Sequence, residues 1–282
     1  MSLLQLPEIK ADARIGTAQF DMRPDALERW EPAICAAASD DPASISIYEQ
    51  IGASWDGSGM TAARMGGILR SIGARDVTVS VNSPGGDFFE GVAIYNLLRQ
   101  HKAKVTVQVM GLAASAASVI AMAGDDILMG DGAFLMIHNA WAVAVGNRHD
   151  FLAASEQLAP FDAAMAEVYA ARSGLSVEET AAMMDKETWI GAAQAVKDGF
   201  ATGMVDRSII SQDTKAQGSK KYLALVEASM ARAGHSRSVR RDALKSLFSG
   251  TPGAAENPAM PSAGADVAAS LQSLLNNMKG TQ

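Results

Sequence analysis

The chain has 282 residues, which is enough for one large domain, or for one domain with an appendage, and for a sizeable core. Nearly half of its residues are hydrophobic and a fifth are charged, as is typical of soluble α/β proteins. The one cysteine, Cys35, excludes an internal disulfide and fits a reducing compartment. Residues 1–16 lack the basic and long apolar regions of a signal peptide, so the sequence predicts a cytoplasmic protein.

The charge is distributed unevenly along the chain. Residues 215–248 carry a net charge of +6, so the rest of the chain must carry −13 to give the overall −7. This asymmetry predicts either an appended module with its own partner or a basic face that docks on the acidic body.

Strands and helices alternate through the first half of the chain. The predicted order is strand 45–51, helix 61–72, strand 77–81, helix 88–101, a strand from 105 to a turn at Gly111, helix 113–123 and an apolar strand ending at Ile137. Asp87 and Glu90 have capping-box spacing at the start of helix 88–101. Short connections between such elements predict a mostly parallel sheet with right-handed crossovers, which binds ligands at the carboxyl ends of its strands.

The second half of the chain is predicted to be mainly helical. A long helical segment covers 151–172 with an interruption near Pro160, because proline removes a helical hydrogen bond. The remaining predicted elements are a helix capped by Ser176 and Glu179 that runs to Met184, helix 192–198, strand 200–205, a polar linker 211–220, a basic helical region 222–248, a disordered stretch 250–264 and a last helix 267–278. The chain thus divides into an N-terminal segment 1–43, a domain 44–210 and a tail 211–282 that is helical and partly disordered.

The stretch between Lys104 and Asp125 holds 20 residues without a charge. A transmembrane helix fits this length. Gln108, several Gly or Ser turn elements and many alanines instead favour a buried strand, a turn and a helix.

Ser115 lies at this turn, at the start of the helix. Free backbone N–H groups and the positive end of the helix dipole can stabilise an oxyanion there. A second turn, 82–86, also joins a strand to a helix. A hydrolytic serine further needs a base and an acid that orients the base. The pattern thus makes Ser115 a candidate nucleophile.

His138 is the best candidate for the base. It follows the apolar strand that ends at Ile137, which places it at the same sheet edge as Ser115. His101 and His149 have charged surface contexts, and His235 belongs to the basic tail. A buried structural histidine explains the pattern around His138 about equally well.

Acidic residues after His138 supply the candidates for the acid. They are Asp162, Glu167, Glu178, Glu179, Asp185, Glu187 and Asp198. Those on helix faces are most simply solvated, whereas Asp185 and Glu187 lie at a constrained junction between a helix and a strand. Ser118 is a second hydroxyl near the turn, but inside a helix packing and a hydrogen bond to a carbonyl explain it better.

Four stretches in order make the chain resemble the Clp protease proteolytic subunit family, over residues of about 45–206. They are VNSPGGDFFEGVAIYNLL (81–98), GLAASAASVIAMAG (111–124), LMIHNA (135–140) and DKETWIGAAQAVKDGFATGMVD (185–206). The resemblance is closer to the ClpP-like head maturation proteases of tailed phages and prophages. The basic stretch 231–247 also resembles the segment that follows the protease domain in that branch.

The resemblance implies a role for individual residues. Ser115 fills the position of the nucleophile, and His138 that of the base. Gly86 and Ala116 fill the backbone oxyanion positions, and a peptide would bind as an added strand along Gly85 and Gly86. Where the housekeeping enzymes have aspartate, this chain has Glu187, and Asp185 two residues away is the fallback acid.

The resemblance also implies a fold and a mechanism. The fold would be the ClpP/crotonase-like α/β fold with a mostly parallel sheet. The enzyme would be a serine endopeptidase that forms an acyl-enzyme without metal or cofactor, and it would process phage capsid or scaffold proteins in the host cytoplasm or procapsid. Its partners would be protein substrates and copies of itself in a ring, with neither membrane nor nucleic acid. The sequence contains no phosphate-binding loop, so any ATP dependence would come from a separate unfoldase.

Two other classes of function stay open. A crotonase-type acyl-CoA enzyme shares the topology but does not require a Ser–His pair. A catalytically silent assembly or scaffold subunit is favoured by the Glu187 substitution and the long tail. A serine–lysine peptidase is disfavoured, because no lysine lies near Ser115 or His138.

The segment 151–172 is expected to lie at subunit contacts of the ring. It contains more apolar side chains than one narrow buried stripe can hold. These are Phe151, Leu152, Leu158, Phe161, Met165, Val168 and Tyr169. The alternative is a helix pair folded back on the core of its own monomer.

Overall fold

The computed structural model describes residues 19–36, 43–206, 210–212 and 219–249. No helix within these ranges is long and apolar enough to cross a membrane. The predicted disordered stretch 250–264 and the predicted helix 267–278 lie outside the described residues.

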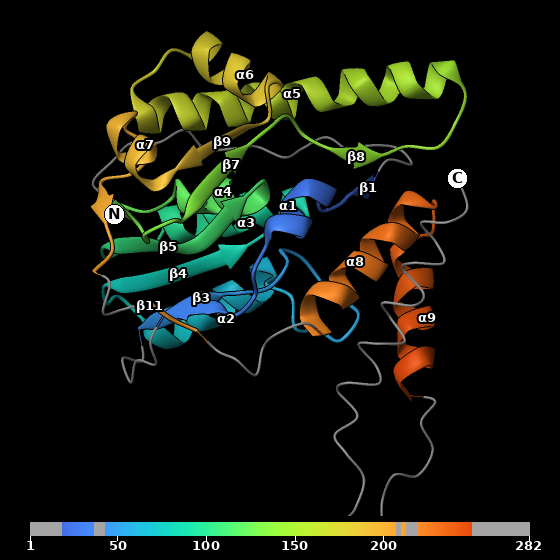
Figure 1. Cartoon of the computed structure of the whole chain (residues 1–282), viewed down its shortest axis with the longest axis horizontal. Helices are drawn as coiled ribbons and strands as arrows, with labels where there is room; N and C mark the ends of the chain where they lie inside the picture. The colour runs from blue at the N-terminus through green and yellow to red at the C-terminus, as the bar shows by residue number, and fades with distance from the viewer. Residues whose placement is uncertain (1–18, 37–42, 207–209, 213–218, 250–282) are drawn as a thin grey trace, which may run out of the picture.

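A mostly parallel sheet forms the centre of the molecule, as predicted (Figure 1). Its parallel strands lie in the order β10 (Gly203–Met204), β6 (Asp126–Met129), β5 (Val105–Ala114), β4 (Val77–Ser83) and β3 (Ser44–Ile47). The end of β5 also pairs in parallel with β7 (Phe134–Ile137), which pairs in the antiparallel sense with β9 (Thr188–Gly191). β5 therefore pairs with β6 along its first part and with β7 at its end, directly before Ser115.

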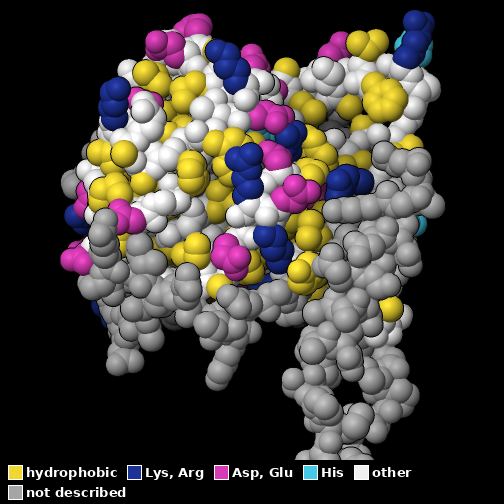
Figure 2. Space-filling model, in the orientation of Figure 1, with side chains coloured by type: hydrophobic (Ala, Val, Ile, Leu, Met, Phe, Trp, Pro, Cys, Tyr) yellow, Lys and Arg dark blue, Asp and Glu magenta, His cyan; other side chains and the backbone are white. Residues whose placement is uncertain are grey.

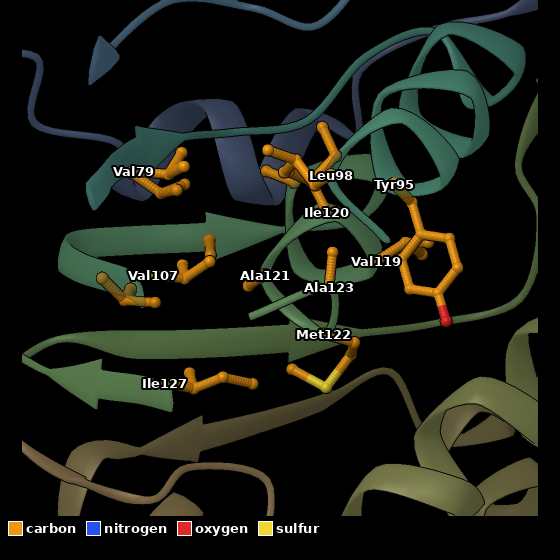
Figure 3. Packing of buried hydrophobic residues seen from close by; sticks show 14 of the residues in the cluster. Val79, Tyr95, Leu98, Val107, Val119, Ile120, Ala121, Met122, Ala123 and Ile127 are labelled. Carbon is orange, nitrogen blue, oxygen red and sulfur yellow. The ribbon is translucent and has the colours of Figure 1, made fainter. Parts of the chain in front are cut away.

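The main hydrophobic core fills the space between one face of the sheet and its helices. Helices α2 (Ala62–Ile72), α3 (Phe88–Arg99), α4 (Ala116–Ala121), α5 (Arg148–Ser173), α6 (Val177–Asp185) and α7 (Ala192–Lys197) contribute to it. Val79, Val107 and Ile127 meet Leu98 and Ile120 in this core (Figure 3). These five side chains are fully buried. Residues two apart along a strand share one face, so alternate residues of each strand point into this core.

The terminal segments cover the opposite face of the sheet. They form β1 (Gln19–Phe20), α1 (Pro24–Arg29), β2 (Ile34–Ala36), β11 (Ile210–Gln212), α8 (Ser219–Arg232) and α9 (Arg237–Ser249). A second core cluster joins Leu27 and Trp30 to Leu112 and Met136 of the sheet and to Ala228 of α8. Leu112 and Ala113 alternate between the two clusters, which shows that the sheet is covered on both sides.

The basic tail docks on the acidic body, which is the second of the two arrangements that its charge predicts. Lys220 pairs with Glu49, Arg237 with Asp87 and Arg240 with Asp21. These contacts place α8 and α9 beside α1 and the loop that follows β4 (Figure 1).

Two predicted boundaries were wrong near the sheet. β5 does not turn at Gly111 but continues to Ala114, because its last residues pair with β7, and helix α4 is correspondingly shorter than the predicted 113–123. β3 ends at Ile47 rather than at residue 51.

Three further expectations about side chains and helices were wrong. α5 runs unbroken through Pro160, which is exposed, so water can satisfy the carbonyl that loses its helical partner. Asp87 caps α3, but the Glu90 carboxylate accepts from the Ala62 amide at 2.6 Å instead of closing a capping box. His101 is 7% exposed and its ring bonds a backbone carbonyl, so it is not a surface residue. The capping box at the start of α6 is confirmed.

Candidate active site

Ser115 joins the end of β5 to the start of α4. Its backbone has φ 56° and ψ −128°, a conformation that residues with a side chain rarely adopt. Its amide donates a hydrogen bond to the Met136 carbonyl at 3.0 Å, which ties the turn to β7. A strained residue held in this way commonly marks a functional position. The predicted strand, turn and helix around Ser115 are therefore present.

The second turn lies directly against the Ser115 turn. Gly85 and Gly86 have φ values of 92° and 145°. A Cβ atom added to Gly85 would lie 2.7 Å from Cβ of Ser115 and 3.2 Å from the amide nitrogen of Ala116. Only glycine permits this approach, which brings the backbone of the second turn to the nucleophile.

The two amides expected to bind an oxyanion are available. Within the described ranges, neither the Gly86 N–H nor the Ala116 N–H donates a hydrogen bond to another residue. Ala116 is the first residue of α4, where backbone N–H groups have no helical acceptor. Both amides can therefore act on a substrate carbonyl bound near Ser115.

Ser118 supports the turn, as the sequence favoured. Its hydroxyl donates to the Ser115 carbonyl at 2.6 Å and lies 2.8 Å from the Tyr169 hydroxyl. Ser118 and Tyr169 are buried, and burial raises the pKa of Tyr169 well above its ordinary value. The Ser118 hydroxyl thus holds the Ser115 carbonyl in place, and Tyr169 of α5 holds the Ser118 hydroxyl.

His138 lies at the same edge of the sheet, one residue after β7. It is 4% exposed, and burial lowers the pKa of its ring to about 4, with a smaller contribution from the positive charge of Arg23. The imidazole is therefore neutral at pH 7, as a general base must be. Among the described residues, no hydrogen bond joins Ser115 to His138.

Glu187 lies close to His138 in the fold, since Thr188 pairs with Ile137. Its φ of 51° is again unusual for a residue with a side chain. Its carboxylate forms an ion pair with Arg23 of the N-terminal segment and, within the described part of the chain, makes no hydrogen bond or ion pair with the imidazole. The structure thus brings all three predicted residues to one edge without linking them into a triad.

Two other carboxylates hold the loop that follows His138. Asp185 accepts from the Asn139 side chain at 2.8 Å, and Asp162 accepts from the Ala140 amide at 2.6 Å. Burial raises the pKa of Asp162. Sequence reasoning missed these roles, and it missed Arg23, because no periodicity or motif marks the residues involved.

A cavity of about 420 Å³ lies where α1 and β2 cover the sheet, and its lining does not include Ser115, His138 or Glu187. It is lined by Leu112, Phe134 and Trp189 of the sheet, and by Arg29, whose guanidinium lies 4.2 Å from the centre of the Trp189 ring. In the described ranges, no group of three or more His, Cys, Asp or Glu side chains is placed to hold a metal ion. The site therefore offers a serine, a neutral imidazole and free amides.

The lowered pKa of His138 predicts a pH-dependent stability. In the unfolded chain the imidazole of His138 takes up a proton near pH 6.5, but in the folded chain it does so only near pH 4. The folded state therefore loses stability as the pH falls from 6.5 to 4, by on the order of 3 kcal/mol. Denaturant unfolding of wild type and His138→Asn across this range measures the effect, and equal losses in both proteins would contradict it.

The sequence matches the Clp protease family over residues 60–208. It is 33% identical over 137 residues to the ATP-dependent Clp protease proteolytic subunit 2 of Rhodococcus jostii, covering 48% of this chain and 70% of that protein. It is 30% identical over 145 residues to the proteolytic subunit of Leuconostoc citreum, covering 50% and 72%. A mutant ClpP1 from Listeria monocytogenes aligns with a TM-score of 0.49 at 21% identity, over 62% of this chain and 95% of that one. Since the matched region is more than half of the sequence, this chain belongs to the Clp protease family.

Proposed function

We propose that the protein is a serine endopeptidase in which Ser115 is the nucleophile, His138 the general base and Glu187 the residue that orients the base. The observation that carries the proposal is the turn at Ser115, whose unusual backbone conformation points to function and against which Gly85 is packed. Membership of a peptidase family and the neutral, buried imidazole support it further.

The proposed reaction proceeds through an acyl-enzyme. His138 takes the proton of Ser115 while the hydroxyl oxygen attacks the scissile carbonyl carbon. The negative charge on the carbonyl oxygen faces the amides of Gly86 and Ala116. The carbon–nitrogen bond then breaks, and the amine leaves with the proton from His138. Water attacks the ester in the same manner and releases Ser115.

The proposed substrates are capsid or scaffold proteins of a tailed phage, cleaved during head maturation. The supporting observation is the resemblance of the SPGG, AAS and MIH motifs and of the basic stretch 231–247 to that branch of the family. Any unfoldase would be a separate ATPase, and the enzyme would work in the host cytoplasm or procapsid.

One structural observation favours a second candidate, a catalytically silent assembly subunit. Ser115 and His138 are not hydrogen-bonded, and Glu187 is paired with Arg23, in the part of the chain that the structure describes. A fluorophosphonate probe distinguishes the two, since it labels only an activated serine. Labelling of Ser115 supports the peptidase, and its absence supports the silent subunit.

Ser115→Ala is expected to abolish cleavage, because the nucleophilic oxygen is lost while the turn keeps its backbone contacts. In comparable enzymes the loss is on the order of 10⁴–10⁶-fold in turnover. A tailed-phage capsid protein is co-expressed with wild type or variant, and its intact mass measures the loss of cleavage and locates the cleavage site. Ser71→Ala, on an exposed part of α2, is the matched control. Near-normal processing by Ser115→Ala would refute the proposal.

Glu187→Gln is expected to lower turnover by roughly 10⁴-fold, because an amide no longer stabilises the imidazolium that forms during catalysis. Asp185→Asn should have a much smaller effect, since Asp185 contacts Asn139 rather than the imidazole. Rates of peptide hydrolysis compare the two. A silent Glu187→Gln with an inactive Asp185→Asn would move the acid to Asp185.

We further propose that the protein forms a ring of identical subunits through the first half of α5. Phe161, Met165, Val168 and Tyr169 in the second half are buried in the core of their own monomer, so the expectation that the whole segment lies at contacts was too broad. Phe151 and Leu152 in the first half are 51% and 59% exposed. Adjacent exposed side chains of this size indicate an interface.

Phe151→Glu is therefore expected to lower the particle mass, because a charge would be buried at the contact. Light scattering measures the mass against the 29.5 kDa of one chain. Leu247→Glu, on the 64% exposed Leu247 of α9, is the matched control and should leave the mass unchanged. A wild-type particle with the mass of a single chain would exclude the ring. Phe161→Glu is unsuitable, since Phe161 lies against Phe88 and Phe89 in the core.

A further inference from the structure

The N-terminal segment pairs with a short strand that closely follows His138. β1 is antiparallel to β8 (Ala142–Val143), with Gln19 opposite Val143 and Phe20 opposite Ala142 (Figure 1). β8 has no other strand partner among the described residues. An extended peptide commonly binds a protein by adding a strand to such an edge. One edge of β8, which begins four residues after His138, is therefore already occupied by this chain.

The next residues of the segment continue across the site. Asp21 and Met22 line a small cavity of about 20 Å³ together with Gly86. Met22 is buried, in the cluster that includes Ala114, the residue before Ser115. Arg23 then pairs with Glu187. Between β1 and α1 the segment thus runs past the oxyanion turn, the nucleophile turn and the acid.

The C-terminal helices hold this segment in place. Arg240 of α9 is 2% exposed and donates to the Asp21 carboxylate at 2.7 Å. Lys221 of α8 donates to the Glu28 carbonyl at 2.6 Å. On the face of the molecule shown in Figure 2, basic and acidic side chains lie close together near the centre of the view. The two ends of the described chain therefore meet over the candidate active site.

We propose that residues 19–25 occupy, in the same molecule, the groove in which a peptide substrate binds, and that a substrate must displace them. This inference rests on the proposed function of Ser115. The segment and a peptide compete for the same backbone edge of β8 and for the same space beside Gly86. A segment in the same chain acts at a high effective concentration, so it competes strongly with a free peptide.

Displacement would also assemble the catalytic residues. While Arg23 is in place, its guanidinium holds the Glu187 carboxylate and its charge opposes protonation of His138. When the segment leaves, Glu187 is free to turn towards the imidazole. The segment is thus both a competitor for the groove and a restraint on the acid.

A reversible disulfide tests the competition. Phe20→Cys and Ala142→Cys stand directly opposite in the antiparallel pair, at a separation that a disulfide can bridge with small adjustments. The variant also carries Cys35→Ser and Ser115→Ala, so that the probe is bound and not cleaved. The probe is a fluorescein-labelled peptide with the sequence of residues 15–26, IGTAQFDMRPDA. Fluorescence anisotropy measures its binding to the oxidised and the reduced protein.

We expect binding to be at least 10-fold weaker in the oxidised protein than in the reduced one. The matched control combines Ser211→Cys with the native Cys35, which stand opposite in β11 and β2, and it should bind equally in both states. Equal affinity in the two states of the 20/142 variant would overturn the inference. Failure of the peptide to bind the reduced form would overturn it as well.

A second variant tests the clamp without a disulfide. Asp21→Asn, in the Ser115→Ala background, weakens the contact with Arg240 and should tighten peptide binding several-fold. Asp126→Asn, which removes a solvent-exposed ion pair with Lys104, is the control and should have no effect. Equal affinity of Asp21→Asn and its parent would count against the inference. Since binding is measured without Ser115, these results are independent of fluorophosphonate labelling, which tests the proposed peptidase activity itself.

Discussion

The candidate site depends on one close contact, that between the backbone of Gly85 and the turn at Ser115. The contact exists because β4 and β5 are neighbouring parallel strands that end at the same edge, with Ser83 opposite Ala113. It also requires that α3 and α4 approach closely, and Gly91 permits this, since a Cβ atom there would lie 2.8 Å from Cβ of Ala116. A side chain at Gly85 or Gly91 would separate the two turns. The packing of β4, β5, α3 and α4 thus determines where the amides of Gly86 and Ala116 lie relative to the Ser115 hydroxyl.

Burial decides the charge state of the His138 imidazole. An imidazole in water is partly protonated near neutral pH, whereas His138 is enclosed at the end of an apolar strand and stays neutral. Arg23 adds to this effect, and Asp25 opposes it. The imidazole of the proposed base is thus neutral without any hydrogen bond to Ser115. The remaining step towards an active arrangement is a movement of side chains and not a change of protonation.

The sequence predicted the parts of the site that follow from local pattern. The alternation of strands and helices gives the parallel sheet, and the glycines at 85 and 86 mark a turn that no other residue type could form. It could not predict that β5 passes through Gly111, because this depends on pairing with β7. Nor could it predict the docking of residues 19–36, since strands of two and three residues and a six-residue helix leave almost no periodic signal. Arg23 and Arg240 owe their roles to contacts over more than 160 residues of sequence.

The clamp formed by Arg240 has the physical character of an exchangeable contact. Its guanidinium is buried between Asp21 and Glu227, yet its Nε atom has no hydrogen-bond partner among the described residues. A buried charge that is only partly satisfied contributes little net stability, because the cost of removing it from water offsets the attraction to its partners. Burial raises the pKa of Glu227, which shows that the same environment disfavours the opposite charge too. Such a contact fixes where the N-terminal segment lies without making its departure costly, which fits the proposed exchange of this segment with a substrate.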